Sequence, residues 1–269
     1  MKVPRPSRRI GLARALSKLG YCSRSKAFGL IRGGHVRLNG NLTRNPESPV
    51  HIGKDRIEVD GISVEVGTLI YFMLNKPRGV VTTASDEKGR ETVYEYLERD
   101  TPWVGPVGRL DKASEGLLLL TNDSEWAAKV TAPETHLDKI YHVQIGIQTR
   151  EEMLDSLVKG VRTKTGEVLR VKSVRRLRSG GKNTWIEVTL DEGKNRQIRR
   201  IFEALGIEVL SLVRVAIGNI VLGELAKGKV RRLAPEEKTG LDRLLEIVEG
   251  RASRLSRRAW TPASPLERP

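Results

Sequence analysis

The chain has 269 residues, which suggests two domains, and its hydrophobic residues (38%) include few aromatics (4%), so the core should be aliphatic. A formal charge of +15 favours a polyanionic partner such as nucleic acid or an acidic membrane surface, although a soluble protein with surplus basic side chains has the same balance. The single cysteine, Cys22, excludes an intramolecular disulfide and a thiolate zinc cluster.

No segment has the composition of a membrane anchor. The N-terminus is rich in arginine but lacks the apolar core of a signal peptide, and no window approaches the ~20 apolar residues that a membrane span needs. A single cysteine also suits a reducing compartment. We therefore expect a cytoplasmic protein without a membrane partner.

Residues 1–66 form the most basic segment, with 13 Lys and Arg against 5 Asp and Glu. Apolar residues at helical spacing predict a helix over residues 12–19, and Ser23 is suited to cap a second helix. Residues 35–38 then alternate as in a strand. We expect two helices and short strands that bind a phosphate backbone through Arg14, Lys18, Arg24, Lys26, Arg32 and Arg37.

Residues 67–235 contain many short strands and few helices. Strands are expected over residues 69–74, 117–120, 140–145 and 185–190. Helices are expected over residues 124–130 and 198–205. Because strands outnumber helices and do not alternate regularly with them, the pattern favours an α+β fold over a doubly wound α/β sheet.

Residues 236–269 form a basic tail that we expect to be disordered, apart from a short helix over residues 241–247. Its basic residues have the charge to touch RNA, but an idle solvated tail is the simpler interpretation.

Several familiar kinds of site are absent from the pattern. The four histidines show no metal-ligand spacing, and no dinucleotide-binding glycine fingerprint is present. Residues 223–229 match the first part of a phosphate-binding loop, but Val230 follows where a hydroxyl would hold magnesium. We interpret residues 223–229 as a turn, and we expect neither a metal nor a cofactor.

The most informative stretch is residues 105–123. It places an Arg-Leu-Asp turn, which ends at Asp111, before a run of four leucines, with glycines on both sides that permit close backbone approach. A carboxylate on a loop at the mouth of a core strand is well placed for catalysis. Aspartates in such turns also commonly cap the turn or pair with arginine, so the position alone leaves both roles open.

Two resemblances to known proteins bear on function, and the second favours a catalytic role for Asp111. The run RALSKLGYCSRSKAFGLIRGGHVRLNG, residues 14–40, resembles the S-four-like RNA-binding domain, whose two helices face the RNA backbone; a solvated basic helical hairpin is the alternative. Residues 105–123 resemble the catalytic-aspartate motif of the bacterial ribosomal pseudouridine synthases of the RsuA type. Three more blocks resemble motifs of that family in the same order, namely residues 75–80, 139–143 and 192–200, and residues 214–218 with Leu222 and Gly223 also fit.

This resemblance implies roles for individual residues. Asp111 corresponds to the essential aspartate, which acts as an ionised nucleophile or base. Burial raises the pKa of a carboxylic acid, so a cation has to keep the group ionised, and Arg199 stands at the motif position for that task. Tyr141 offers a flat ring for the extruded base and a phenol that can move a proton. Arg109 is assigned to RNA contact or to nucleotide flipping, and Arg196 to RNA binding.

The resemblance also implies an architecture and a substrate. We expect a small S-four-like domain followed by a catalytic domain with a mixed, largely antiparallel sheet. The implied reaction is the isomerisation of one uridine in ribosomal RNA, with 23S rRNA favoured over 16S rRNA and an assembly intermediate as the particle. The isomerisation consumes no cofactor and needs no metal. We expect a monomer.

Two other functions are compatible with parts of the sequence. A non-catalytic ribosome-assembly factor would use residues 1–66 alone, but the intact motifs around Asp111, Tyr141 and Arg199 argue against it. A hydrolase that releases a free base would need a group that activates water, and the sequence identifies none.

Overall fold

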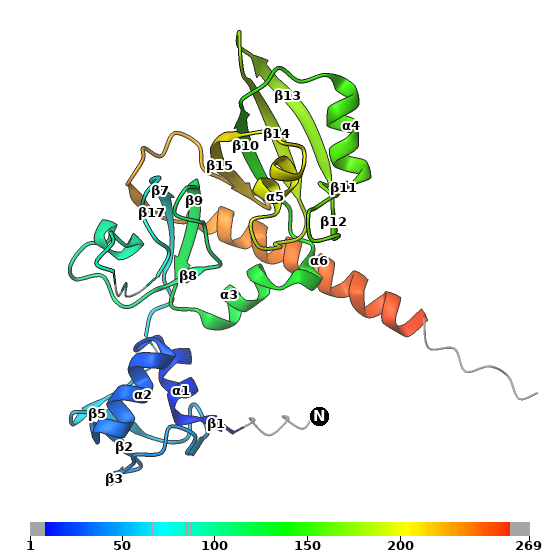
Figure 1. The fold of residues 1–269 in the computed structure, drawn as a ribbon. Coiled ribbons are helices and arrows are strands. Elements are labelled where there is room, and N and C mark those ends of the chain that lie inside the picture. Colours follow the sequence, from blue (N-terminus) through cyan, green and yellow to red (C-terminus); the bar gives the residue numbers. More distant parts are fainter. Residues whose placement is uncertain (1–8, 66, 84–85, 87, 259–269) are drawn as a thin grey trace, which may run out of the picture.

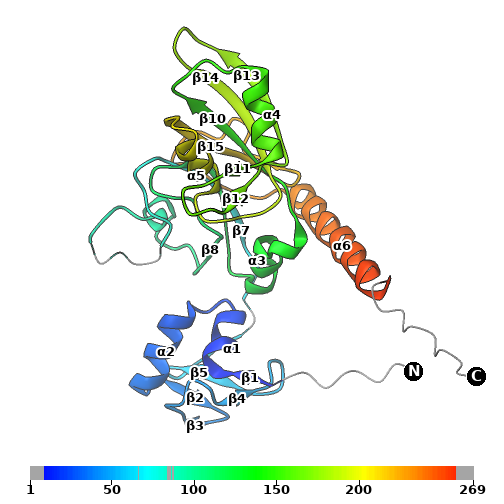
Figure 2. The same ribbon diagram turned by 45° about the vertical axis from the view of Figure 1, so that its right-hand side comes forward.

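Figures 1 and 2 show the computed structural model, which describes residues 9–65, 67–83, 86 and 88–258, with side chains as far as residue 247. A small N-terminal domain precedes a larger domain that is built on one nine-stranded sheet. The chain passes from the first to the second between Ser63 and Tyr71.

The N-terminal domain packs two helices on small antiparallel sheets. The helices are α1 (Leu12–Lys18) and α2 (Arg24–Gly33). The main sheet has the order β3-β2-β5-β6, with strands β2 (Val36–Leu38), β3 (Asn41–Leu42), β5 (Ile57–Val59) and β6 (Ile62–Ser63). A second pair joins β1 (Ile10–Gly11) to β4 (Pro49–Val50).

Local sequence signals explain the second helix. The Ser23 hydroxyl accepts a hydrogen bond from the Lys26 amide at 3.1 Å, which confirms the expected N-cap. Gly34 ends the helix in the left-handed conformation with φ of 81°, where a glycine has no steric penalty. Leu12, Leu16 and Ile31 are fully buried between the helices and the strands, so both helices are held by an aliphatic core.

The large sheet has the order β13-β14-β10-β15-β9-β7-β17, with β16 paired to β15 and β8 paired to β9. Its strands are β7 (Tyr71–Lys76), β8 (Gly105–Val107), β9 (Glu115–Thr121), β10 (Lys139–Ile145), β13 (Ser173–Ser179), β14 (Thr184–Leu190), β15 (Val209–Ile217), β16 (Ile220–Val221) and β17 (Val230–Arg232). A separate pair joins β11 (Val161–Arg162) to β12 (Val168–Leu169).

One parallel pairing divides this sheet. Strands β15 and β9 run parallel, with Val213 opposite Glu115 and Arg214 opposite Gly116, whereas the other described pairs of the sheet are antiparallel. We call this β15–β9 contact the seam. The mixed, largely antiparallel sheet expected from the sequence is therefore confirmed.

Helices cover both faces of the large sheet (Figures 1 and 2). One face carries α3 (Ser124–Thr131), the 3-10 turn η2 (Pro133–Thr135) and α6 (Pro235–Arg258), packed on β7 and β9. The other face carries α4 (Glu151–Lys159) and α5 (Gln197–Ala204) on β10 and β14. The 3-10 turn η1 (Val93–Tyr96) packs on this second face beside β7.

The C-terminal segment differs from the expected disordered tail. Residues 235–258 form one continuous helix, α6, and not only the short helix expected over residues 241–247. Leu241 and Leu245 lie one helical turn apart and are buried against the sheet, and Trp126 Nε1 donates to the Asp242 carboxylate at 2.9 Å. Packing of this apolar stripe extends the order, while residues 259–269 lie outside the described residues.

Candidate active site

A cleft of about 580 Å³ lies over the seam of the large sheet. Its walls come from the loop before β9, from β10, from β15 and from the start of α5. Asp111, Tyr141 and Arg199, which the sequence analysis singles out, all line this cleft. Arg109 and Arg196 line it as well. Fold and motif thus bring together side chains from four separate stretches of the chain.

Asp111 sits in a tight turn whose backbone is fixed by hydrogen bonds. The Ser114 amide donates to the Asp111 carbonyl at 2.9 Å, and the Gly79 amide donates to the Lys112 carbonyl at 2.7 Å. The side chain of Asp111 itself remains 31% exposed. The carboxylate is therefore presented to the cleft by a backbone that has little freedom to move.

Lys76, the last residue of strand β7, connects this strand to the Asp111 turn through hydrogen bonds. It is fully buried, and its ammonium donates to the carbonyls of Pro77 at 3.0 Å, Asp111 at 3.3 Å and Ser114 at 2.9 Å. Three carbonyls satisfy the three donors of an ammonium group. Burial lowers the pKa of Lys76 to about 8, and the nearby carboxylates of Glu115 and Asp111 oppose that shift.

Two arginines of the block at residues 192–200, Arg196 and Arg199, lie near Asp111 but make different contacts. Arg196 donates to the Asp111 carboxylate at 3.4 Å and makes the ion pair that the sequence analysis expects of Arg199. Arg199 donates instead to the Ala113 carbonyl at 2.8 Å, and its Nε is buried without a hydrogen-bond partner among the described residues. Burial lowers the pKa of Arg199, with the charge of Arg196 adding to the effect.

Tyr141 stands on β10 at the junction of two apolar clusters, one under α5 and one under the Asp111 loop. It is half-buried and lies opposite Arg214 of β15 in the strand register. No hydrogen bond to its phenol is seen among the described residues, which leaves the hydroxyl available to a ligand in the cleft.

Arg214 is a cleft residue to which the sequence analysis gives no role. It is only 5% exposed; its Nε donates to the Leu117 carbonyl at 2.8 Å, and one terminal nitrogen is buried without a partner among the described residues. The available signal for Arg214 was an arginine at an inward-facing position of a largely apolar strand. The signal for Lys76 was its place in the block of residues 75–80. Lys139 lines the cleft too, and burial lowers its pKa, with the charge of Arg214 adding to the effect.

The N-terminal residues assigned to RNA are mostly on the surface. Lys18 differs, because it forms an ion pair with Glu125 of α3 and so joins the two domains. The Arg37 guanidinium donates to the Gly40 carbonyl at 3.0 Å, and that of Arg32 lies 5.9 Å from the Phe28 ring centroid. The exposed ones are Arg14, Arg24, Lys26, Arg32 and Arg37.

The described residues show neither a metal site nor a membrane-spanning helix. Within this part of the chain, no group of three or more His, Cys, Asp or Glu is arranged to hold a metal ion. None of the helices described here combines the length and the apolar composition that crossing a membrane requires.

Comparisons with known proteins give a consistent result. The family model for RNA pseudouridylate synthase matches residues 70–204, and the S4 domain model matches residues 10–65. Ribosomal large subunit pseudouridine synthase B of Bacillus subtilis (strain 168) is 38% identical over 227 residues, which cover 84% of this chain and 93% of that protein. An uncharacterized RNA pseudouridine synthase of Aquifex aeolicus (strain VF5) is 37% identical over 219 residues, covering 81% and 88%. A crystal structure of a pseudouridylate synthase superposes with a TM-score of 0.61 at 29% identity, covering 86% of this chain and 99% of that one.

Proposed function

Since this chain belongs to the RNA pseudouridylate synthase family, we propose that it isomerises one uridine of ribosomal RNA, with Asp111 as the nucleophile. The family and the enzyme class follow from the matches over the catalytic and S4 domains. The substrate and the roles of individual residues are the proposal.

The observation that carries the proposal is the placement of Asp111. Its backbone is fixed by the bonds from Lys76 and Ser114, while its carboxylate faces a cleft of about 580 Å³ that has room for a flipped nucleotide. A preorganised nucleophile avoids the loss of entropy that would otherwise accompany the reaction.

The proposed reaction keeps every atom of the uridine. The Asp111 carboxylate attacks C1′ of the ribose as the N1–C1′ bond breaks, and the freed uracil turns within the cleft. C5 then bonds to C1′ and the carboxylate leaves. C5 loses a proton and N1 gains one, so nothing is oxidised. Tyr141 is the group we assign to hold the uracil ring and to move that proton.

The cations of the cleft support this chemistry electrostatically. Arg196 lies beside Asp111, and Arg199 and Arg214 each keep one buried nitrogen that lacks a partner among the described residues. A buried N–H without a partner costs free energy, and both residues line the cleft, so we assign their guanidinium groups to bind a phosphate or an oxygen of the flipped nucleotide. Arg109, exposed at the rim, is assigned to the RNA strand.

We propose large-subunit rRNA, within an assembly intermediate, as the substrate of a monomeric enzyme in the cytoplasm. The choice of subunit rests on the relative in Bacillus subtilis, which is named for the large subunit. The basic N-terminal domain supplies the contacts to the phosphate backbone.

Asp111→Asn is the decisive variant. It keeps the size and polarity of the side chain but removes the charge, so we expect rRNA binding within a few fold of wild type and no isomerisation. Pseudouridine mapping of large-subunit rRNA after incubation with each protein measures the product. Turnover above about a tenth of wild type in the variant would exclude Asp111 as the nucleophile.

The same reactions separate isomerisation from hydrolysis. Isomerisation leaves the mass of the RNA unchanged, whereas release of a free base lowers it. Mass spectrometry of the product RNA therefore rejects the proposal if a loss of uracil is found.

A further inference from the structure

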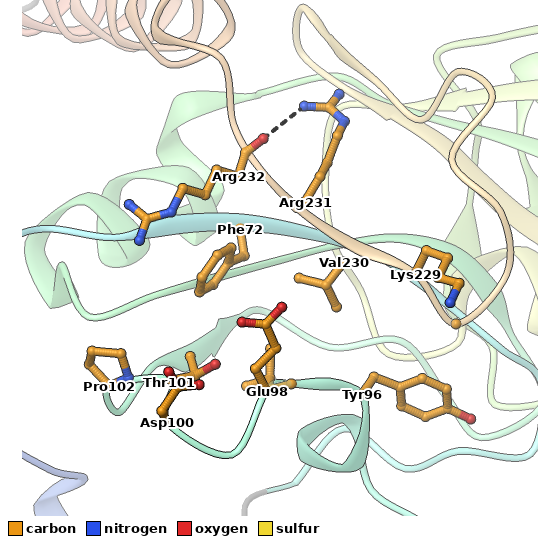
Figure 3. Close-up of a pocket in the computed structure, with 12 residues that line it drawn as sticks. Phe72, Tyr96, Glu98, Asp100, Thr101, Pro102, Lys229, Val230, Arg231 and Arg232 are labelled. Atoms are coloured by element: carbon orange, nitrogen blue, oxygen red, sulfur yellow. Dashed lines mark hydrogen bonds between the residues drawn. The ribbon is translucent and has the colours of Figure 1, made fainter.

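A second hollow, of about 480 Å³, lies at the edge of the large sheet where β17 pairs with β7 (Figure 3). One wall is formed by Phe72, Val230 and Arg232 of the two strands, and the facing wall by the segment after η1, which includes Glu98. The catalytic proposal assigns no role to this hollow, which we call the edge pocket.

The edge pocket presents a flat aromatic surface. Arg232 is directly opposite Phe72 in the strand register, and its guanidinium lies 5.7 Å from the centroid of the Phe72 ring. Phe72 is only partly buried, and Arg232 is exposed. An aromatic ring next to a guanidinium plane is the arrangement on which nucleic-acid bases stack, and each stacked base contributes ~1–3 kcal/mol.

Two cations of the pocket have no acidic partner among the described residues. These are Lys229 and Arg232, both exposed. Their neighbours differ: Arg231 is held by both oxygens of Glu237 at 2.7 Å, and Lys227 pairs with Glu115 at 2.5 Å. Lys229 and Arg232 thus carry charge that is free to meet a phosphate.

The turn that resembles the start of a phosphate-binding loop ends in this pocket. Residues 223–229 connect β16 to β17, as the turn interpretation expects, and Gly228 and Lys229 line the hollow. A Cβ on Gly228 would lie 2.9 Å from the Tyr96 ring, so glycine allows the turn to close against that ring. The Tyr96 phenol is already engaged, since it donates to Glu91 at 2.6 Å.

A carboxylate indicates which base fits. Figure 3 shows the Glu98 carboxylate directed toward the space between Phe72 and Val230, with Asp100 farther along the same segment. A carboxylate only accepts hydrogen bonds. Guanine alone among the four RNA bases offers two adjacent N–H donors, N1–H and the 2-amino group, to a pair of carboxylate oxygens. Uracil, cytosine and adenine each place an acceptor beside their donor.

The edge pocket and the catalytic cleft share one face of the sheet. A single apolar cluster contains Leu110, Leu118 and Leu120, and both Tyr141 of the cleft and Phe72 of the pocket pack against it. The two sites thus lie over the same core cluster, and we infer that one RNA molecule reaches both.

We propose that the edge pocket binds an unpaired guanosine of the same RNA whose uridine enters the cleft. The base stacks on Phe72 and Arg232, Glu98 accepts from its Watson–Crick edge, and Lys229 meets the phosphate. This inference rests on the proposed function, because it takes rRNA as the ligand.

Photochemical cross-linking locates the base. Transcripts of large-subunit rRNA carrying 6-thioguanosine are irradiated with the full chain, and the attached peptides are identified by mass spectrometry. We expect attachment within residues 72, 96–102 or 228–232. Attachment only elsewhere, or attachment here from 4-thiouridine transcripts in preference, overturns the proposal.

Glu98→Gln tests the choice of base, with Glu224→Gln as the matched exposed control. Replacing the cross-linked guanosine by inosine removes only the 2-amino group. In wild type and in Glu224→Gln this replacement should raise KM about tenfold, because a hydrogen bond to a charged group is lost. In Glu98→Gln the neutral amide oxygen still accepts from the 2-amino group, but more weakly, so the same replacement should raise KM only about threefold. Equal responses in all three proteins overturn the assignment of Glu98.

Isomerisation measured in the same reactions keeps the two proposals apart. Glu98→Gln should leave kcat unchanged, because Glu98 does not touch the cleft. If the transcript is isomerised but no guanosine is attached at the edge pocket, the pocket proposal alone fails. If wild type cross-links there and does not isomerise the RNA, the pocket proposal stands and the catalytic one fails.

Discussion

At the scale of single residues, the candidate site shows what a motif predicts and what it leaves out. Asp111, Tyr141 and Arg199 were identified through motif positions, and all three line one cleft. The ion pair that Asp111 forms was not predictable from motif positions. Whether Arg196 or Arg199 meets the carboxylate depends on where α5 begins, and Arg196 occupies the left-handed position before it with φ of 49°.

Arg199→Ala should damage catalysis much more than Arg200→Ala. Arg199 binds the Asp111 turn through the Ala113 carbonyl, whereas Arg200 pairs with Glu167 at 2.6 Å nearer the surface. Losing a hydrogen bond from a charged group to a backbone carbonyl costs ~1.5–3 kcal/mol, against ~0–1 kcal/mol for an ion pair near the surface. We expect single-turnover rates about a hundredfold lower for Arg199→Ala and within about threefold of wild type for Arg200→Ala. Equal defects in the two variants would mean that another arginine supports the Asp111 turn, and Arg196→Ala is the next variant to measure.

Lys76 should make stability depend on pH in the alkaline range. Its pKa is about 8 in the folded protein and 10.5 in the unfolded chain, so between these values the unfolded chain binds more protons and stability rises with pH. Relative to Lys76→Met, the free energy of unfolding of wild type should increase by roughly 1–3 kcal/mol from pH 8 to pH 10. Urea unfolding measures it, with exposed Lys112→Met as the control. A difference that stays flat with pH would refute the prediction.

At the scale of elements, helices and strands with strong local sequence patterns were predictable, and those with weak patterns were not. The capped helix after Ser23 and the leucine strand β9 both follow their sequence signals. The sequence did not predict strand β13. This strand lies at the sheet edge with almost every side chain exposed, so it has no apolar alternation. Strand β15 is interrupted by Arg214, whose inward position only tertiary contacts explain. Helix α4 buries only Leu154 and Leu157, too few to stand out.

Gly116 should be the least replaceable glycine at the seam. Its φ is 101°, and a Cβ there would lie 2.3 Å from the Arg214 carbonyl oxygen. We expect Gly116→Ala to lower the free energy of unfolding by at least about 2 kcal/mol, because strain and a backbone clash act together. Gly193→Ala, where nothing lies within 4 Å, is the control in urea unfolding. A loss no larger than that of the control would mean that the seam can shift to accept a side chain.

At the scale of the whole molecule, charge and domain order were predictable because they depend on composition and motif order alone. The S4 model, at residues 10–65, precedes the synthase model, at residues 70–204, in the order that the sequence predicts. The contact between them was not predictable. It combines the Lys18–Glu125 ion pair with Asn122, which lies next to Gly20 of the first domain. The Asn122 side-chain amide donates to the Thr68 carbonyl at 2.9 Å and accepts from the Ile70 amide at 2.8 Å.

Removing exposed charge from the S4 domain should flatten the salt dependence of RNA binding. Each phosphate contact contributes ~0.7–0.9 to the slope of log K against log salt. The triple variant Arg14→Ala, Arg24→Ala, Lys26→Ala should therefore reduce the slope by about two, while kcat at saturating RNA is unchanged. Fluorescence anisotropy across salt concentrations measures the slope. The control is the triple variant Arg150→Ala, Lys159→Ala, Lys182→Ala, all exposed in the other domain; the same slope in both triples would contradict the docking role.

The pairing of β10 with β15 has a consequence for protein engineering. The segment from β10 to β15 enters and leaves the sheet at one place, since Lys139 pairs with Ile217 and the Gly218 amide donates to the Asp138 carbonyl at 2.8 Å. Adjacent ends are the geometry that tolerates cutting and rejoining of a chain. Asp111 lies outside this segment, while Tyr141 and Arg199 lie within it. Excising residues 139–217 and joining residue 138 to residue 218 would give two pieces, one with Asp111 and one with Tyr141 and Arg199. Each piece lacks part of the proposed catalytic set, so activity should return only when the two reassemble.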